Sequence, residues 1–433
     1  MHPNFHSPTG SHHSCPGASK SCSTAKAANI PHQGVGRREF LATGGVAALG
    51  GLLLPALRGA DAPATTPLVK QPAAANPVVD PHQNALVGIA RGSNMEDAVR
   101  SAVTLAGGLG FIRDGQTVLI KPNVTGAAKF PTTTNPEVLY AVIKLVAERG
   151  PKRIYVSDRC FSPAFTEVAP KTINVMKYVG HLDAVEAAKK DFKAPVVALG
   201  LEAAAQELER LGRPAHTPLW RRLKPANATH WPNGFEQAEL LFAVDHVINV
   251  PVIKTHFQAW FTMSMKAFVG MSHHRSRLEF HRSLAGEWSL FRQKARRRRR
   301  RGIMPDVEAE DAAVAPFVNR IAELNLGIRP AMNILDGTTS FVFGGPSQGD
   351  TASPKLIVAS TDRIAADATG VAVLKSIGTE PRLQNRPIWS NPFLKHGIKI
   401  GLGIGSPEQL VLKDAGIPER EIERIRVLLM QTV

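Results

Sequence analysis

The sequence has 433 residues, of which 43% are hydrophobic, so the chain can bury a normal core and is long enough for one large domain or two smaller ones. Lys and Arg (52) outnumber Asp and Glu (36), and the formal net charge of +16 at pH 7 favours anionic partners such as small acids, phosphates or lipid headgroups. The basic residues are not interleaved with aromatic side chains, so we expect no nucleic-acid binding.

The N-terminal region is predicted to be a disordered leader and signal peptide covering residues 1–62. Residues 1–35 are rich in Ser, His, Pro and Gly, and residues 36–41 (GRREFL) match the twin-arginine pattern. The apolar run 41–57 is short and rich in glycine, and the small residues at 60–62 suit a signal peptidase. This order predicts export of the folded protein by the twin-arginine translocase to the periplasm or another extracytoplasmic space. The alternative is an uncleaved N-terminal membrane anchor.

The positions of the cysteines limit the cofactors that the chain can hold. Cys15 and Cys22 lie in the leader, so Cys160 is the only cysteine of the predicted mature chain. One cysteine can form neither an intrachain disulfide nor an iron–sulfur cluster, and we expect no such cluster. No local feature near Cys160 lowers the pKa of its thiol, so this residue is predicted to pack in the core.

After a Pro/Ala-rich linker at 63–83, residues 84–433 alternate between short apolar runs and amphipathic segments. This alternation predicts an α/β fold with a mainly parallel sheet and helices on both of its faces, in one domain or two intimate subdomains. The predicted strands are 86–90, 117–120, 153–156, 195–199, 246–250, 332–335 and 356–359, and the predicted helices are 95–109, 136–148, 182–190, 202–210, 364–375 and 419–430.

One segment, 275–311, breaks the alternation because it is polar and strongly charged. It contains the uninterrupted basic run Arg296–Arg301. We interpret it as a solvated basic insertion in the domain. The alternative is that the run contacts an anionic membrane surface.

Polar side chains with anion-binding chemistry follow the first central strand. Lys121 and Asn123 come directly after that strand, and Thr133 and Thr134 precede a helix that Pro136 begins. A helix N-terminus with hydroxyl groups and a nearby ammonium group is a natural anion site, so these four side chains are predicted to bind substrate. The alternative is ordinary capping of the helix.

Two acidic residues also follow predicted strands. Asp158 could orient a catalytic Lys or His, or it could cap a turn. Asp336 is the better candidate to meet cationic side chains. Because ligands of open α/β sheets bind at the carboxyl ends of the strands, we predict Asp158 as a catalytic residue and Asp336 as a substrate-binding residue.

The densest group of titratable side chains lies between residues 249 and 281. Lys254 and His256 follow an apolar strand, and Lys266 and His281 come soon after them. Imidazole groups suit proton transfer near neutral pH and metal binding, and a buried Lys can bind a carboxylate or act as a nucleophile. We predict His256 and Lys254 as catalytic residues, Lys266 as a substrate-binding residue and His281 as a metal ligand. The alternative is that each is a solvated surface residue.

The order of these motifs resembles the domain of unknown function 362 family of bacteria and archaea. The motifs are 120–123 (IKPN), the Thr-rich loop, 249–256 (NVPVIKTH), Lys266 with Gly270, 336–337 with 344–346, and 360–362 with Asp367, over about residues 86–415. Members often carry an added ferredoxin-like iron–sulfur module, and this chain has no cysteine-rich segment to form one. The resemblance implies the domain and its site positions, but no particular reaction.

The spacing of His256, Lys266 and His281 is also similar to that of lactate racemase-type enzymes, which hold a nickel pincer nucleotide. The resemblance implies that Lys266 would tether the cofactor, that His256 would act as the acid or base, and that His281 would bind nickel. This chain departs from the pattern, because residues 263–265 (MSM) stand where those enzymes usually have a Gly-Gly pair before the Lys.

The sequence therefore predicts an exported enzyme that acts on a small anionic substrate, a carboxylate or a phosphate, with a Lys/His site. Two alternatives stay open at this point. One is a periplasmic ligand-binding or assembly protein without turnover, and the other is a racemase or epimerase of the nickel-pincer type.

Overall fold

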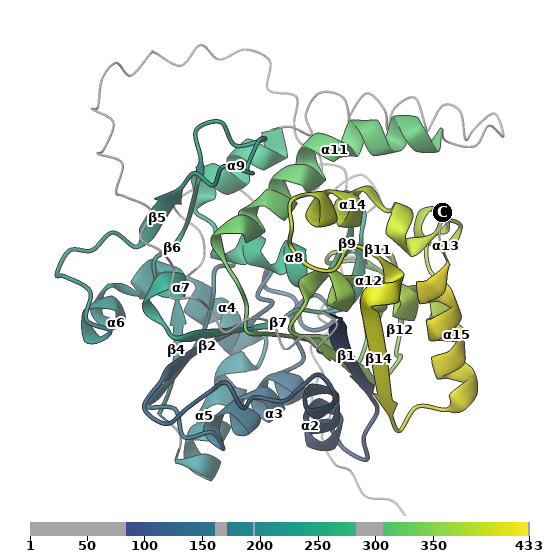
Figure 1. Ribbon diagram of the computed structural model, residues 1–433. Coiled ribbons are helices and arrows are strands. Elements are labelled where there is room, and N and C mark those ends of the chain that lie inside the picture. Colours follow the sequence, from purple (N-terminus) through teal and green to yellow (C-terminus); the bar gives the residue numbers. More distant parts are fainter. Residues whose placement is uncertain (1–83, 161–170, 194, 283–305, 432–433) are drawn as a thin grey trace, which may run out of the picture. The chain divides into compact units, whose positions relative to one another are not determined.

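A computed structural model of the chain describes residues 84–160, 171–193, 195–282 and 306–431. An eight-stranded sheet runs through these residues in the order β14-β1-β13-β10-β7-β2-β3-β4 (Figure 1). Its strands are β1 (Ala85–Ala90), β2 (Thr117–Pro122), β3 (Arg153–Asp158), β4 (Val196–Gly200), β7 (His246–Val250), β10 (Met332–Gly337), β13 (Leu356–Ser360) and β14 (Leu410–Ala415). The α/β fold predicted from the alternating pattern is confirmed.

Strand β13 runs against the other strands of this sheet. It pairs antiparallel with β1 and β10, whereas the remaining neighbouring pairs are parallel. The sheet is therefore mainly parallel, as predicted, and β2, β3, β7 and β10 all end at one edge. Strand β13 runs in the opposite direction, so its last residue, Ser360, pairs with Asn333 near the start of β10. Asp362 follows this strand and caps helix α12 (Arg363–Ile377) by accepting a hydrogen bond from the Ala365 N–H at 2.8 Å.

Helices cover both faces of the sheet (Figure 1). On one face lie α2 (Met95–Leu105), α3 (Pro136–Ala147) and α5 (His181–Phe192). On the other face lie α8 (Ser264–Ala267), α11 (Val307–Glu323), α12 and α14 (Pro392–Lys399), with α15 (Glu419–Met430) packed on α12. Neighbouring strand residues point to opposite faces, and Ile334 and Leu335 are fully buried in two different cores for this reason.

Helix α3 begins as the sequence predicts. Pro136 occupies its first turn, and the Asn135 side chain accepts a hydrogen bond from the Glu137 N–H at 3.0 Å. The predicted helix at 202–210 is broken instead, into the 3₁₀ turn η1 (Leu201–Ala203) and helix α6 (Ala205–Arg210).

Shorter elements connect the main ones. The ribbons are β5 (Trp220–Leu223) with β6 (Phe235–Ala238), β8 (Lys254–His256) with β9 (Trp260–Thr262), and β11 (Ser340–Gly344) with β12 (Gly349–Ala352). The short helices are α4 (Thr172–Tyr178), α7 (Leu240–Ala243), α9 (His274–Arg282) and α13 (Pro381–Gln384), and the 3₁₀ turns are η2 (Phe268–Met271), η3 (Leu324–Gly327), η4 (Ile388–Ser390) and η5 (Pro407–Gln409).

Some predictions fall outside the described residues. These are the leader, the twin-arginine signal and the linker before residue 84, and the basic run Arg296–Arg301. The predicted polar insertion starts later than expected, because Ser276 and Arg277 are buried in α9. Within the part of the chain that the structure describes, no helix combines the length and the apolar character needed to cross a membrane.

Candidate functional site

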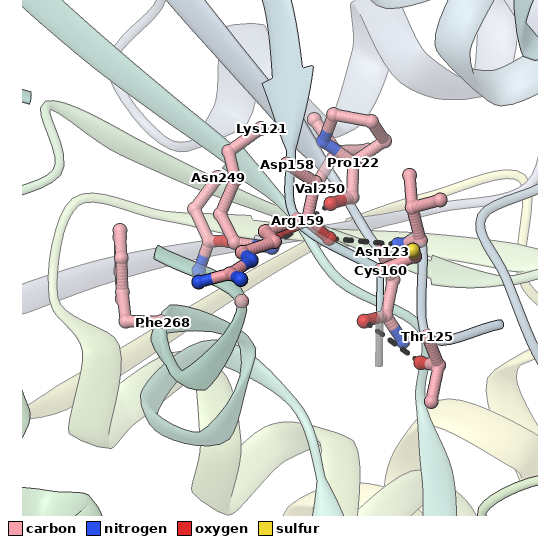
Figure 2. A network of polar contacts seen from close by, with 12 residues as sticks. Lys121, Pro122, Asn123, Thr125, Asp158, Arg159, Cys160, Asn249, Val250 and Phe268 are labelled. Atoms are coloured by element: carbon pink, nitrogen blue, oxygen red, sulfur yellow. Dashed lines mark hydrogen bonds and ion pairs between the residues drawn. The ribbon is translucent and has the colours of Figure 1, made fainter. Parts of the chain in front are cut away.

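The carboxyl ends of β2 and β3 carry a buried ion pair. Lys121 Nζ lies 3.2 Å from Asp158 Oδ1, and the two side chains are 0% and 2% exposed. Lys121 also donates to the Pro122 carbonyl at 2.9 Å, and Asp158 Oδ2 accepts the Val124 N–H at 2.8 Å. Burial lowers the pKa of Lys121, while the charge of Asp158 opposes that shift. Figure 2 shows the two side chains facing each other where the strands end.

Arg277 is a third charged group near this pair. Its guanidinium is buried and donates to the carbonyl oxygens of Ser272 and Gly270, and also of Arg159 and Cys160. Burial lowers its pKa to about 10, and the charge of Asp158 opposes the shift. A Cβ added at Gly270 would overlap Asp158 Oδ1, so this close approach of η2 to β3 requires glycine.

The loop after β2 is held by its own hydroxyl groups. Thr134 Oγ1 accepts the Asn123 N–H at 2.8 Å and donates to the Val250 carbonyl at 2.7 Å, which ties β2 to β7. Thr133 Oγ1 donates to the Ala128 carbonyl at 3.1 Å. Both hydroxyl groups are therefore engaged in loop contacts. Asn123 Nδ2 is buried and has no hydrogen-bond partner among the described residues.

Asp336, at the end of β10, accepts a hydrogen bond from the same loop. Its Oδ2 accepts the Asn135 N–H at 2.8 Å, and its Oδ1 accepts the N–H and the hydroxyl of Thr338 at 3.0 and 2.7 Å. Burial raises the pKa of this carboxyl, while the hydrogen bonds and the charge of Lys254 act in the opposite direction. The charge of Lys254 therefore acts on Asp336, while the oxygens of Asp336 hold backbone groups in place.

Lys254 is fully buried on the β8–β9 ribbon. Its Nζ donates to the carbonyl oxygens of Thr132 at 2.5 Å and Pro346 at 2.9 Å. Burial lowers its pKa well below the ordinary value, and the charge of Lys266 adds to the effect. These shifts favour the neutral amine, which has two N–H groups for the two carbonyls and a lone pair left for a proton.

His256 lies two residues further on the same face of the ribbon. Its Nδ1 accepts the backbone N–H groups of Gln258 and Ala259, both at 3.1 Å, so the ring proton is on Nε2. The ring stacks on Phe257, with 5.4 Å between centroids. Burial lowers the pKa of His256 well below its ordinary value, and the charges of Lys266 and Lys254 add to that, so the ring is neutral near pH 7.

Lys266, on α8, keeps some solvent exposure. Among the described residues it has no hydrogen-bond or ion-pair partner, and its electrostatic neighbours include Arg277, Lys254 and His256. Burial, with a smaller effect of Arg277, lowers the pKa of Lys266 to about 8. Within the described ranges Lys266 therefore has basic neighbours and no counter-ion.

His281, on α9, joins the same electrostatic neighbourhood. Its Nδ1 donates to the Arg277 carbonyl at 2.7 Å, and its ring contacts Phe317. Burial lowers its pKa to about 4, and the charges of Lys266 and Arg277 act in the same direction. Within the described residues, His281 belongs to no group of three side chains with ligand atoms close enough to hold a metal ion. We call Lys254, His256, Lys266 and His281 the cationic cluster.

Sequence reasoning missed three features of this region. Arg277 was included in the polar segment and gave no local signal of burial. Trp260 Nε1 and Thr262 Oγ1 are buried and find no hydrogen-bond partner in the described part of the chain, and both lie opposite residues of the cationic cluster across the β8–β9 ribbon. Trp260 also has φ +70°, which is unfavourable for a bulky residue and is found mainly where the surrounding structure enforces it.

Cys160 takes the predicted packing role. It is 2% exposed in the core between α3, α4 and α5, and burial raises the pKa of its thiol. A raised pKa disfavours the thiolate, which is the reactive form.

The segment before Lys266 does not fit a tethered pincer nucleotide. Met263, Ser264 and Met265 are fully buried where the racemase pattern has Gly-Gly. The N–H groups of Ser264 and Met265 already donate to the Asp367 carboxylate, at 2.6 and 3.1 Å, so they cannot meet a phosphate. The neutral states of Lys254 and His256 follow from burial and neighbouring charges, and do not require a bound pincer nucleotide.

Comparisons with known proteins gave three findings. The profile of a family described as a domain of unknown function (DUF362) matches residues 118–372. A thylakoid-associated protein of Synechocystis sp. is 24% identical over 327 residues, which cover 74% of this chain and 83% of that protein. The lactate racemase apoprotein from Thermoanaerobacterium thermosaccharolyticum is similar at 14% identity and a TM-score of 0.37, over 66% of this chain and 57% of that chain.

Proposed function

The chain belongs to the domain of unknown function 362 family, and from this premise we propose that it is an enzyme acting on a small carboxylate or phosphate at the cationic cluster. The observation that carries the proposal is the ammonium group of Lys266, which has no hydrogen-bond or ion-pair partner within the described residues and has Arg277 as a basic neighbour. An anion bound there would relieve the repulsion and form charge-assisted hydrogen bonds.

Two further groups suit chemistry on a bound anion. His256 is neutral with its proton on Nε2, so it can donate a hydrogen bond to a developing negative charge without itself being a cation. Lys254 favours the neutral amine, so its lone pair can accept a proton from the substrate. The proposed division of roles is that Lys266 binds, Lys254 accepts a proton and His256 stabilises the resulting charge.

The other predicted site residues make contacts with each other and with the backbone of the neighbouring loops. Lys121 pairs with Asp158, Thr134 bridges Asn123 to Val250, and Asp336 holds the start of α3. We propose that Lys121, Asp158 and Asp336 position the loops around the cationic cluster rather than contact substrate. Their roles in catalysis and substrate binding stay predictions, which substitutions at these three positions can test.

Binding and turnover can be tested with one matched pair of variants. Lys266→Met removes the proposed anion contact, and Lys413→Met removes the same charge from an exposed position on β14. Inorganic phosphate, acetate and lactate serve as probes in calorimetric titrations. We expect Lys266→Met to weaken binding of the preferred probe by about tenfold or more, because charge-assisted hydrogen bonds contribute about 1.5–3 kcal/mol, and Lys413→Met to leave it unchanged.

Proton transfer needs its own measurement. The protein is incubated with the same carboxylates in D₂O, and exchange of carbon-bound hydrogen is followed by NMR. Exchange that disappears in Lys254→Met would support the enzyme. Binding without exchange or any other turnover would favour the ligand-binding protein, and equal binding by wild type and Lys266→Met would end the proposal for this cluster.

We also propose export by the twin-arginine translocase, on the basis of residues 36–41. The thylakoid association of the Synechocystis relative is compatible with a protein that reaches a membrane-bounded compartment. Changing Arg37 and Arg38 together to Lys should leave the protein in the cytoplasmic fraction, and unchanged fractionation would exclude this route.

A further inference from the structure

A second cluster of potential metal ligands lies apart from the cationic cluster. It combines His230, in the connection between β5 and β6, with Glu323 at the end of α11 and His396 on α14. His230 Nδ1 lies 2.6 Å and His396 Nε2 lies 3.0 Å from the same oxygen, Glu323 Oε1. All three ligand atoms lie within 4.8 Å of one another.

The carboxylate in this cluster is buried without a cationic Lys or Arg. The Glu323 side chain is 0% exposed, and its ion-pair partners among the described residues are only the two histidines. Its oxygens also accept the His230 N–H at 2.9 Å and the Thr229 hydroxyl at 3.3 Å. A buried carboxylate is costly unless it is paired with a charge or coordinates a metal.

The surrounding residues hold the ligands in place. The Trp231 indole N–H donates to the Arg320 carbonyl at 3.0 Å, and Arg320 Nε donates to the His230 carbonyl at 3.0 Å. The other ring nitrogen of His230, Nε2, lies 3.2 Å from the Asn319 side-chain amide. A hydrogen-bond partner at the second ring nitrogen fixes the orientation of a metal-binding imidazole, and the Asn319 amide is placed to serve as that partner.

From this geometry we propose that His230 Nδ1, Glu323 and His396 Nε2 bind a divalent transition-metal ion, Zn²⁺ by the chemistry of its donors. Two imidazoles and one carboxylate are a common ligand set for this ion. Ligand atoms around tetrahedral zinc lie about 3.4 Å apart. The contacts of 2.6 and 3.0 Å must therefore widen by about 0.8 and 0.4 Å to admit the ion, which small rotations of the side chains can supply.

The site is accessible to an ion and leaves a coordination position open. The His230 side chain is 32% exposed and His396 is 10% exposed, so solvent reaches the ligands from one side. Both rings bind the ion as neutral imidazoles by moving their proton to the other nitrogen, and the Asn319 amide then turns its oxygen toward His230 Nε2. The bound ion would cross-link the β5–β6 connection to α11 and α14.

The experiment compares full-length proteins stripped of metal and then incubated with Zn²⁺. Glu323→Gln and His396→Gln remove ligands with little change of volume, and His216→Asn removes an exposed histidine as the control. The leader brings its own histidines and cysteines in all of these proteins, so the difference between them reports on the cluster. After desalting, bound metal is measured per chain together with the melting temperature.

We expect wild type and His216→Asn to retain one more zinc ion per chain than the two ligand variants, and to melt at a higher temperature with Zn²⁺ than without it. Equal zinc content in wild type and both ligand variants would overturn the proposal. So would a wild-type melting temperature that Zn²⁺ does not change.

Co²⁺ provides a test that does not depend on the variants folding. Bound at this cluster in the wild-type protein, Co²⁺ should give the visible absorption of a nitrogen- and oxygen-ligated site of low coordination number, without a thiolate charge-transfer band. Absence of that absorption would refute the site. A spectrum with thiolate ligation alone would also refute it, because the ion would then be bound by cysteines, which this cluster lacks.

Discussion

Asp158→Ala is the most informative single change, because it separates a structural role of the Lys121–Asp158 pair from a role in contact with substrate. It leaves the Lys121 ammonium at 0% exposure with the Pro122 carbonyl as its remaining acceptor, and it leaves the Val124 N–H without its acceptor. Removing one partner of a buried ion pair costs about 3–5 kcal/mol. We expect the free energy of unfolding to fall by that amount.

An exposed ion pair between α2 and the end of α3 provides the control. Arg100 and Glu148 are bidentate, with distances of 2.6 and 2.8 Å, but their side chains are 47% and 39% exposed. Exposed pairs contribute about 0.2–1 kcal/mol, so Glu148→Ala should cost no more than about 1 kcal/mol. Urea unfolding with linear extrapolation measures both variants on one scale.

The double variant Lys121→Met/Asp158→Ala completes the comparison. Without the buried ammonium, the loss of Asp158 no longer leaves a buried charge unpaired. The double variant should therefore be more stable than the sum of the two single changes predicts, by about 1–3 kcal/mol. An Asp158→Ala protein as stable as Glu148→Ala would refute the structural interpretation. Lys121 and Asp158 would then be candidates for direct contact with a ligand.

Three further outcomes follow from the described contacts. Binding of phosphate or carboxylate should weaken as the pH rises through about 8, where Lys266 loses its charge, and calorimetry on Lys266→Arg should show binding that persists to higher pH. Burial lowers the pKa of His181 from 6.5 to about 4. Between these pH values the unfolded chain binds a proton at this residue and the folded chain does not. The free energy of unfolding should therefore fall by roughly 3 kcal/mol as the pH falls from 6.5 to 4. In His181→Phe, urea unfolding near pH 5 should show about one proton fewer taken up on unfolding, and an unchanged pH dependence would contradict the assignment. Gly270→Ala should destabilise the protein by about 1–3 kcal/mol because its Cβ overlaps Asp158, whereas Gly110→Ala, with nothing near its Cβ, should not, and equal melting temperatures of the two would contradict this packing.

Local patterns were sufficient to predict much of the fold. The apolar runs at 117–120, 153–156 and 246–250 are central strands, and Asn135 with Pro136 begins α3 where expected. These signals are reliable because they are local. A strand buried on both faces is a continuous apolar run, and a helix start is recognised from its capping residue and the residue that follows. The sequence also placed Lys254, His256, Lys266 and His281 in one neighbourhood, because only 28 positions hold all four.

Pairing between distant segments was beyond those patterns. Strand β13 runs antiparallel between β1 and β10, and this reversal pairs its last residue, Ser360, with Asn333 near the start of β10. A run of apolar residues has the same pattern in either direction, so the direction of β13 could not be predicted from its residues. The contact between Lys121 and Asp158 also depends on tertiary pairing, because the parallel pairing of β2 and β3 brings Asp158 Oδ1 to 3.2 Å from Lys121 Nζ.

The partners of buried polar groups came from the tertiary fold for the same reason. Arg277 lies in a charged stretch, yet packing of α9 buries its guanidinium among backbone carbonyls. His230 and His396 meet Glu323 although 93 and 73 positions separate them from it. The sequence determines which groups are available and which local elements form, and three-dimensional packing determines which groups lose water together and must therefore satisfy one another.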